Sequence, residues 1–141
     1  METQRIAALI GDVHAGVNRS LAAALESRGI KGLAPSHGAI LHHLFLRGEA
    51  SMKELAAAAK RDKSTVTALV KKLVAAGYVA TEAAPDDLRS VRVRLTGAGR
   101  ALEPAFREIS QALLERAWRG IAPDDRGRLV RLLETMEANF L

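Results

Sequence analysis

Residues 63–76 read KSTVTALVKKLVAA, and this stretch determines the fold prediction for the chain. Its apolar residues recur at intervals of three and four, which is the period of one helical face. That face consists of Val66, Leu69, Val70 and Leu73. The other positions are small, hydroxylated or cationic, namely Lys63, Ser64, Thr65, Thr67, Ala68, Lys71 and Lys72. The segment is therefore predicted to be a helix with one buried side and one cationic side, ended by Gly77.

A shorter helix is predicted immediately before this one. The sequence Ser51-Met52-Lys53-Glu54 is typical of a capping box, in which Ser51 accepts the backbone N–H of Glu54 and the Glu54 side chain reaches back. An alanine-rich stretch follows, and the polar residues 60–62 form a turn. Two short helices joined by a tight turn form a helix-turn-helix, whose second helix enters the major groove of DNA. Small side chains allow close approach to the bases, and lysines reach the phosphates.

A β-ribbon is predicted after the second helix. Residues 78–82 and 91–95 alternate in the manner of strands, with one apolar face and one face that carries Arg92 and Arg94. The loop between them, residues 83–90, has a charged tip that includes Arg89. Arginine is favoured in the narrow, electronegative minor groove. The chain is thus predicted to be mainly α with a two-stranded β wing, a winged helix-turn-helix.

Amphipathic helices are predicted on both sides of this centre. A helix of some 25 residues within residues 2–28 would be about 37 Å long, so much of its apolar stripe needs a partner from elsewhere. A second helix is predicted from Pro35 to Leu46. After residue 97 a helix runs toward Trp118 with a kink or break near Pro104, and the last helix starts at Pro123.

These patterns predict how the chain is organised. A second subunit is the simplest source of the missing apolar partner, so the chain is expected to be a homodimer. Residues 1–34 and 101–141 are then dimerisation helices, and residues 35–100 form a DNA-binding lobe within one structural domain.

Composition narrows the function. The chain has 141 residues, with 48% hydrophobic and 26% charged residues, which suits one globular domain. The absence of cysteine excludes disulfides, thiolate zinc sites and a cysteine nucleophile. Residues 60–100 hold nine lysines and arginines against four acids, which equals the whole net charge of +5. Such a local surplus favours a polyanion partner. No apolar run is long enough to span a bilayer, so a cytoplasmic location without a membrane partner is expected.

Several motifs resemble the MarR family of bacterial transcription regulators. The resemblance rests on Leu55-Ala56, residues 64–73, Gly77-Tyr78-Val79, Asp87-Leu88-Arg89-Ser90 and Leu95-Thr96-Gly97-Ala98-Gly99. It implies a dimer with interlocked terminal helices and two winged lobes. It also implies that Ser64, Thr65 and Thr67 meet bases. Arg89 matches the wing-tip arginine, and Asp87 matches the acid that orients it.

Other positions complete the predicted interface. Ser90 and Arg92 are expected to contact DNA together with the wing tip. Ala68 stands where many family members place a long polar or basic residue, so this position is expected to contribute methyl contact instead. The resulting hypothesis is a repressor that binds a pseudo-palindromic operator as a dimer.

The resemblance further implies release of the operator by a small aromatic or phenolic acid. Polar groups that could line its pocket are His14, Asn18, His42 and His43, although each could equally be an ordinary surface or core residue. A metal-responsive regulator is an alternative, but no ligand spacing supports a metal, and no cofactor is expected.

Two other classes of function are less well supported. An enzyme would need a nucleophile, an acid–base pair or a phosphate-binding loop, and the sequence carries no such motif. A winged helix that contacts RNA or protein is the alternative function. Single-stranded RNA readers usually expose aromatic residues for stacking, whereas Tyr78 is the only aromatic residue between Phe45 and Phe106.

Overall fold

The computed structural model describes residues 2–84 and 86–141, with side chains for all of these except residues 87–89. The chain divides into two compact units, Met1–Ile109 and Ser110–Leu141.

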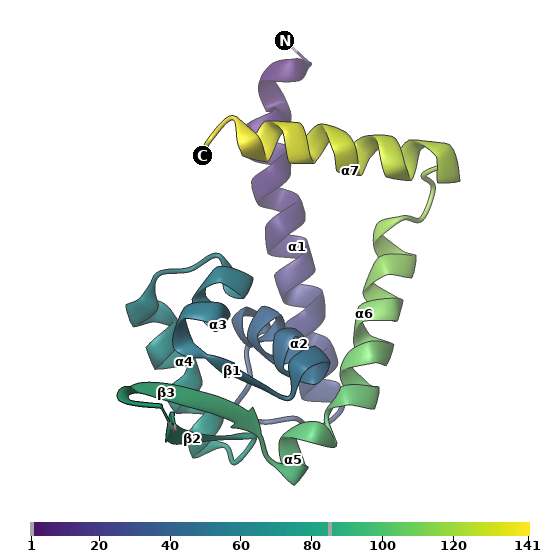
Figure 1. Ribbon diagram of the computed structural model, residues 1–141. Coiled ribbons are helices and arrows are strands. Elements are labelled where there is room, and N and C mark those ends of the chain that lie inside the picture. The colour runs from purple at the N-terminus through teal and green to yellow at the C-terminus, as the bar shows by residue number, and fades with distance from the viewer. Residues whose placement is uncertain (1, 85) are drawn as a thin grey trace. The chain divides into compact units, whose positions relative to one another are not determined.

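The first unit contains the helix-turn-helix and the wing (Figure 1). Its elements in chain order are η1 (Thr3–Arg5), α1 (Ile6–Ser27), η2 (Pro35–His37), α2 (Gly38–Arg47), β1 (Glu49–Ser51), α3 (Met52–Ala59), α4 (Lys63–Ala75), β2 (Val79–Ala84), β3 (Asp87–Leu95), α5 (Gly97–Arg100) and the first part of α6 (Glu103–Ala117). The fold prediction is confirmed, since the chain is mainly helical with a small antiparallel wing.

The sheet differs from the predicted two-stranded ribbon in having a third strand. Its order is β1-β3-β2 with both pairings antiparallel, and β1 aligns Ala50 with Val93. The two wing strands also extend further than predicted, because Ala84 still pairs with Asp87. The predicted loop at residues 83–90 is therefore largely strand. The pairing of β1 with β3 ties the wing to the start of the helix-turn-helix.

The core of this unit lies between α2, α3, α4 and the inner face of the sheet. The predicted apolar stripe of α4 is buried there, which confirms that part of the prediction. The fully buried side chains include Ile40, Leu41, Leu44, Leu55, Val66, Val70, Leu73 and Val93. Phe45 and Phe106 meet edge to face at 5.7 Å, which brings the start of α6 against α2.

The helix break predicted near Pro104 is confirmed. Helix α5 ends at Arg100, and α6 begins at Glu103, so Pro104 lies in the first turn of α6, where its missing N–H costs no helical bond. Thr96 starts α5, because its Oγ1 accepts the N–H of Gly99 at 3.1 Å and donates to the Gly77 carbonyl at 2.6 Å. This hydroxyl joins α5 to the end of α4.

Helix α1 has 22 residues, and only its C-terminal end is buried, at Leu25. Large apolar side chains in its first half are exposed, namely Ile6, Leu9, Ile10 and Val13. Beyond its end, Arg28 forms a 2.8 Å ion pair with Glu108 of α6. Among the described residues, no helix combines the length and the apolar character needed to cross a membrane.

The second unit consists of the end of α6 and α7 (Pro123–Ala138). Pro123 and two acids open α7, as predicted. Arg126 stabilises the corner between the helices, because its Nε donates to the Ile121 carbonyl at 3.0 Å and its guanidinium lies 5.9 Å from the centre of the Trp118 ring. Helix α7 has no buried residue.

His37 is a buried titratable group that the sequence analysis did not single out. It is 2% exposed, and its Nδ1 accepts the Ala34 N–H at 2.9 Å. Burial lowers the pKa of His37, and the charge of Lys72 on α4 lowers it further. The neutral imidazole therefore belongs to the folded state.

This environment predicts a pH-dependent stability. The unfolded chain binds a proton at His37 near pH 6.5, whereas the folded chain binds it only at lower pH. The His37 contribution to the free energy of unfolding is complete above about pH 6.5 and decreases as the pH falls through the folded pKa. Denaturant titrations at pH values from about 7.5 down to about 5 should show this decrease in the free energy of unfolding. His37→Asn should reduce it, whereas His42→Asn, at an exposed position, should not. An equal pH dependence in all three proteins would contradict this assignment.

Candidate nucleic-acid interface

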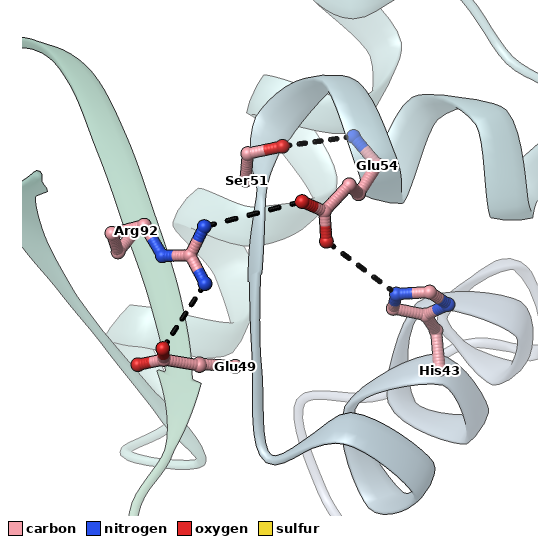
Figure 2. Close-up of polar contacts among 5 residues, drawn as sticks. All are labelled: His43, Glu49, Ser51, Glu54 and Arg92. Atoms are coloured by element: carbon pink, nitrogen blue, oxygen red, sulfur yellow. Dashed lines mark hydrogen bonds and ion pairs between the residues drawn. The ribbon is translucent and has the colours of Figure 1, made fainter.

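The helix-turn-helix is formed by α3, a short turn and α4. Ser51 caps α3, since its Oγ accepts the Glu54 N–H at 3.1 Å. The other half of the predicted capping box differs, because the Glu54 carboxylate faces Arg92 and His43 (Figure 2). Lys60 ends α3 in the left-handed region at φ 53°. Asp62 then starts α4, so the two helices are separated by only three residues.

Asp62 sets the start of α4. Its Oδ1 accepts the Thr65 N–H at 2.7 Å and the Ser64 hydroxyl at 2.9 Å. These bonds, chiefly the one from the Thr65 backbone, lower the pKa of Asp62, and the nearby Arg61 charge lowers it further. The sequence analysis did not include Asp62 among the site residues. Its position before Lys63-Ser64-Thr65 is a recognisable N-cap signal.

The predicted reading face of α4 is accessible. Lys63, Ser64, Ala68, Lys71 and Lys72 are exposed, and Thr65 and Thr67 are partly exposed. The Thr67 hydroxyl donates to the Lys63 carbonyl at 2.8 Å, which fixes the orientation of its methyl group. The face therefore begins with Lys63, continues with small groups and carries Lys71 and Lys72 toward its end. This is a surface that can enter a groove and reach phosphates.

The outer face of the sheet is different, because its arginines are paired with acids. Arg92 lies 3.0 Å from Glu49 and 3.9 Å from Glu54 (Figure 2), and Arg94 lies 3.5 Å from Glu82. Both pairs within the sheet are diagonal, since Glu49 is aligned with Arg94 and Glu82 with Arg92. The positive charge of residues 60–100 is therefore concentrated on α4 rather than on this face.

Of the residues predicted for the wing tip, the structure describes the side chain of Ser90 but not those of Asp87 and Arg89. Ser90 lies on β3 and is exposed. The side chains of Asp87 and Arg89 lie outside the described part of the structure. Their contacts with DNA and with each other stay predictions.

The effector role of the four polar residues stays a prediction, and two of them lie together on α1. Asn18 and His14 are hydrogen-bonded to each other at 3.1 Å on α1. His42 is exposed, and His43 faces Glu54 at 3.9 Å. Within residues 2–84 and 86–141, no group of three acidic or histidine side chains is arranged to hold a metal ion.

Comparison with known proteins identifies the family. Residues 31–90 match the MarR family. The chain is 32% identical over 101 residues to the HTH-type transcriptional repressor IacR of Pseudomonas putida, an alignment that covers 72% of this chain and 60% of IacR. A MarR mutant from E. coli, solved in complex with operator DNA, has the same fold, with a TM-score of 0.84, 24% identity and coverage of 96% and 95% of the two chains.

A third similar protein is BpsR of Bordetella bronchiseptica, whose DNA binding is regulated by 6-hydroxynicotinic acid. It matches with a TM-score of 0.75 and 26% identity over 91% of this chain and 92% of BpsR. The matched family consists of transcriptional regulators rather than enzymes. With its helix-turn-helix, exposed cationic helix and antiparallel wing, the chain belongs to the MarR family of DNA-binding winged-helix transcriptional regulators.

Proposed function

We propose that this protein is a repressor that binds a pseudo-palindromic operator as a homodimer and releases it when a small aromatic acid binds. The observation that carries the proposal is the exposed face of α4, where small side chains precede Lys71 and Lys72 on a helix held by an N-cap. Two similar proteins support the same function. The E. coli MarR mutant was solved in complex with operator DNA, and IacR is a transcriptional repressor by name.

Dimer formation is supported by the apolar side chains that each unit exposes. In the first unit they include Ile6, Leu9, Ile10 and Val13 on α1, and Val13 is 65% exposed. In the second unit they include Leu129, Val130, Leu132, Leu133 and Phe140. Apolar stripes of this kind on helices are typical of interfaces between subunits.

In vitro selection tests the proposal. Wild-type protein would be used to enrich duplexes from a random library about three helical turns long, after its mass in solution has been measured by light scattering. A dimer should enrich an inverted repeat with half-site centres about 10 base pairs apart. Recovery of no consensus, or of a single half-site bound by a monomer, would contradict the proposal.

The lysines of α4 give a quantitative prediction. Each phosphate contact adds about 0.9 to the steepness with which log K falls with log salt. The double change Lys71→Met and Lys72→Met should therefore reduce that slope by about 2 per protomer and weaken binding to selected and random duplexes alike. Fluorescence anisotropy at several salt concentrations measures both quantities. Lys31→Met, an exposed lysine in the segment that follows α1, is the matched control and should leave the slope unchanged.

The effector is proposed to be a hydroxylated aromatic carboxylic acid. The support is BpsR, together with a surface pocket of about 280 Å³ at the end of α1. Its lining includes Leu25, Ile30 and Leu33, which offer apolar walls, and it carries one cation, Lys31, and one acid, Glu26. Lys31 is the group that could bind a carboxylate. Release requires that the acid bind the DNA-free dimer more tightly than the bound one. Titrating 6-hydroxynicotinic acid and related acids into the protein–duplex complex, with thermal shift of the free protein, tests this. Acids that bind without releasing DNA would contradict it.

A further inference from the structure

We propose that Arg92 is a positioning residue that holds the wing against the helix-turn-helix, and that it does not contact DNA. This inference rests on the proposed function, because it concerns how the two DNA-reading elements are held together. It also replaces the sequence-based interpretation of Arg92 as a direct contact.

The guanidinium of Arg92 connects three elements of the lobe. Arg92 lies on β3, the central strand, where its backbone is aligned with Ser51 of β1 and Glu82 of β2. Its Nη2 contacts Glu49 of β1 at 3.0 Å, and its Nη1 lies 3.9 Å from Glu54 of α3. Figure 2 shows the planar group between the two carboxylates, one from each side. The wing strand is thereby linked to the first helix of the helix-turn-helix.

The link continues to α2 through the second oxygen of Glu54. Glu54 Oε2 lies 3.9 Å from His43 Nε2, on the other side from Arg92 (Figure 2). The Glu54 backbone N–H donates to Ser51 Oγ, which holds its main chain, and the carboxylate lies 3.9 Å from both Arg92 and His43. A carboxylate held in this way is a suitable anchor for an arginine from another element.

Charge at this place does not favour a phosphate. The cluster borders an open pocket of about 500 Å³ lined by His43, Arg47, Glu49, Glu54 and Arg92, in which two arginines are balanced by two glutamates. The Arg92 side chain is 30% exposed, and both of its terminal nitrogens face carboxylates. A phosphate would have to compete with those acids, whereas Lys63, Lys71 and Lys72 of α4 are exposed and form no ion pair with an acid among the described residues.

Arg94 provides a matched control from the same strand and the same face. It pairs with Glu82 on the adjacent wing strand, and its side chain is 55% exposed. That pair lies within the hairpin and reaches no helix. Removing Arg94 should therefore leave the placement of the wing unchanged, although it removes the same charge.

The test compares Arg92→Met, Arg92→Lys, Glu54→Gln and Arg94→Met on the selected duplex and on a shuffled duplex. Arg92→Met should reduce the preference for the selected duplex about tenfold, the size of one lost base contact, with an unchanged salt slope. Arg92→Lys should fail to restore that preference, because an ammonium cannot bridge two carboxylates as the planar fork does. Glu54→Gln should also lower the preference for the selected duplex, whereas Arg94→Met should leave it unchanged. Thermal unfolding measures whether each variant is folded.

Three results would overturn the inference. They are a salt slope reduced by about 0.9 in Arg92→Met, full restoration by lysine, and tighter specific binding by Glu54→Gln, since a contacting arginine would be freed by loss of its acid. If Arg92→Met does not fold, Arg92→Lys and Glu54→Gln test the positioning role instead, because both keep a polar group at the cluster. A wild-type protein without preference for any duplex would overturn the proposed function as well as this inference.

Discussion

Replacement of Gly99 by alanine is expected to destabilise the lobe by about 3 kcal/mol or more, the upper end for a side chain forced into a packed site. Gly99 is buried in α5, and a Cβ added there would overlap the carbonyl oxygen of Tyr78 and lie 3.0 Å from the Leu95 side chain. The Tyr78 carbonyl cannot move away easily, because it accepts the Thr96 N–H at 3.1 Å. The clash is thus with fixed backbone.

The neighbouring glycine of the same helix is the matched control. A Cβ at Gly97 meets nothing within 4 Å, and alanine is a better helix former than glycine. Gly97→Ala should therefore change stability by no more than about 1 kcal/mol, toward greater stability. Thermal denaturation measures both, and Gly99→Ala should lower Tm by about 10 °C. Similar Tm values for the two variants would show that the backbone around Tyr78 moves to make room for the added methyl group.

The elements that could be predicted from the sequence are those with a local signal. The apolar stripe of α4, the stop at Gly77, the break before Pro104 and the proline at the start of α7 each depend on residues close together in the chain. Strand β1 has no such signal. Its three residues, Glu49–Ser51, are extended because Ala50 packs in the core and aligns with Val93, more than forty positions later.

The candidate site also contains some residues with a local sequence signal and others that only the fold brings together. The exposed face of α4 follows from helical period alone, so its residues could be named in advance. The partners of Arg92 could not, because Glu49 and Glu54 come to it only through the pairing of β1 with β3 and the packing of α3. His37 lies at the entry to α2, and no local pattern in the sequence shows that it is buried. The Asp62 cap, in contrast, has a local signal, because Asp62 stands directly before Lys63-Ser64-Thr65.

Ala68→Glu is expected to abolish recognition of the selected duplex while leaving the fold intact. Ala68 is exposed in the middle of the reading face of α4. A glutamate there would place a carboxylate against the DNA backbone, and it would lie three and four positions before Lys71 and Lys72, where helical neighbours form ion pairs. It would therefore repel phosphates and also neutralise two cations that attract them. Affinity for the selected duplex should fall by about 100-fold or more, since like charges at an interface cost several kcal/mol.

Ala75→Glu on the same helix separates this effect from a general loss of positive charge. Ala75 is exposed as well, and it lies seven residues later, about 10 Å along the axis on nearly the same face. A glutamate at Ala75 can also pair with Lys71 and Lys72, which lie four and three positions before it. If the start of α4 enters the groove, however, this carboxylate stays outside the groove, so the loss should be clearly smaller than that of Ala68→Glu. Anisotropy with the selected duplex, at one stated salt concentration, gives both values. Equal losses at the two positions would mean that α4 attracts DNA by its charge without entering the groove.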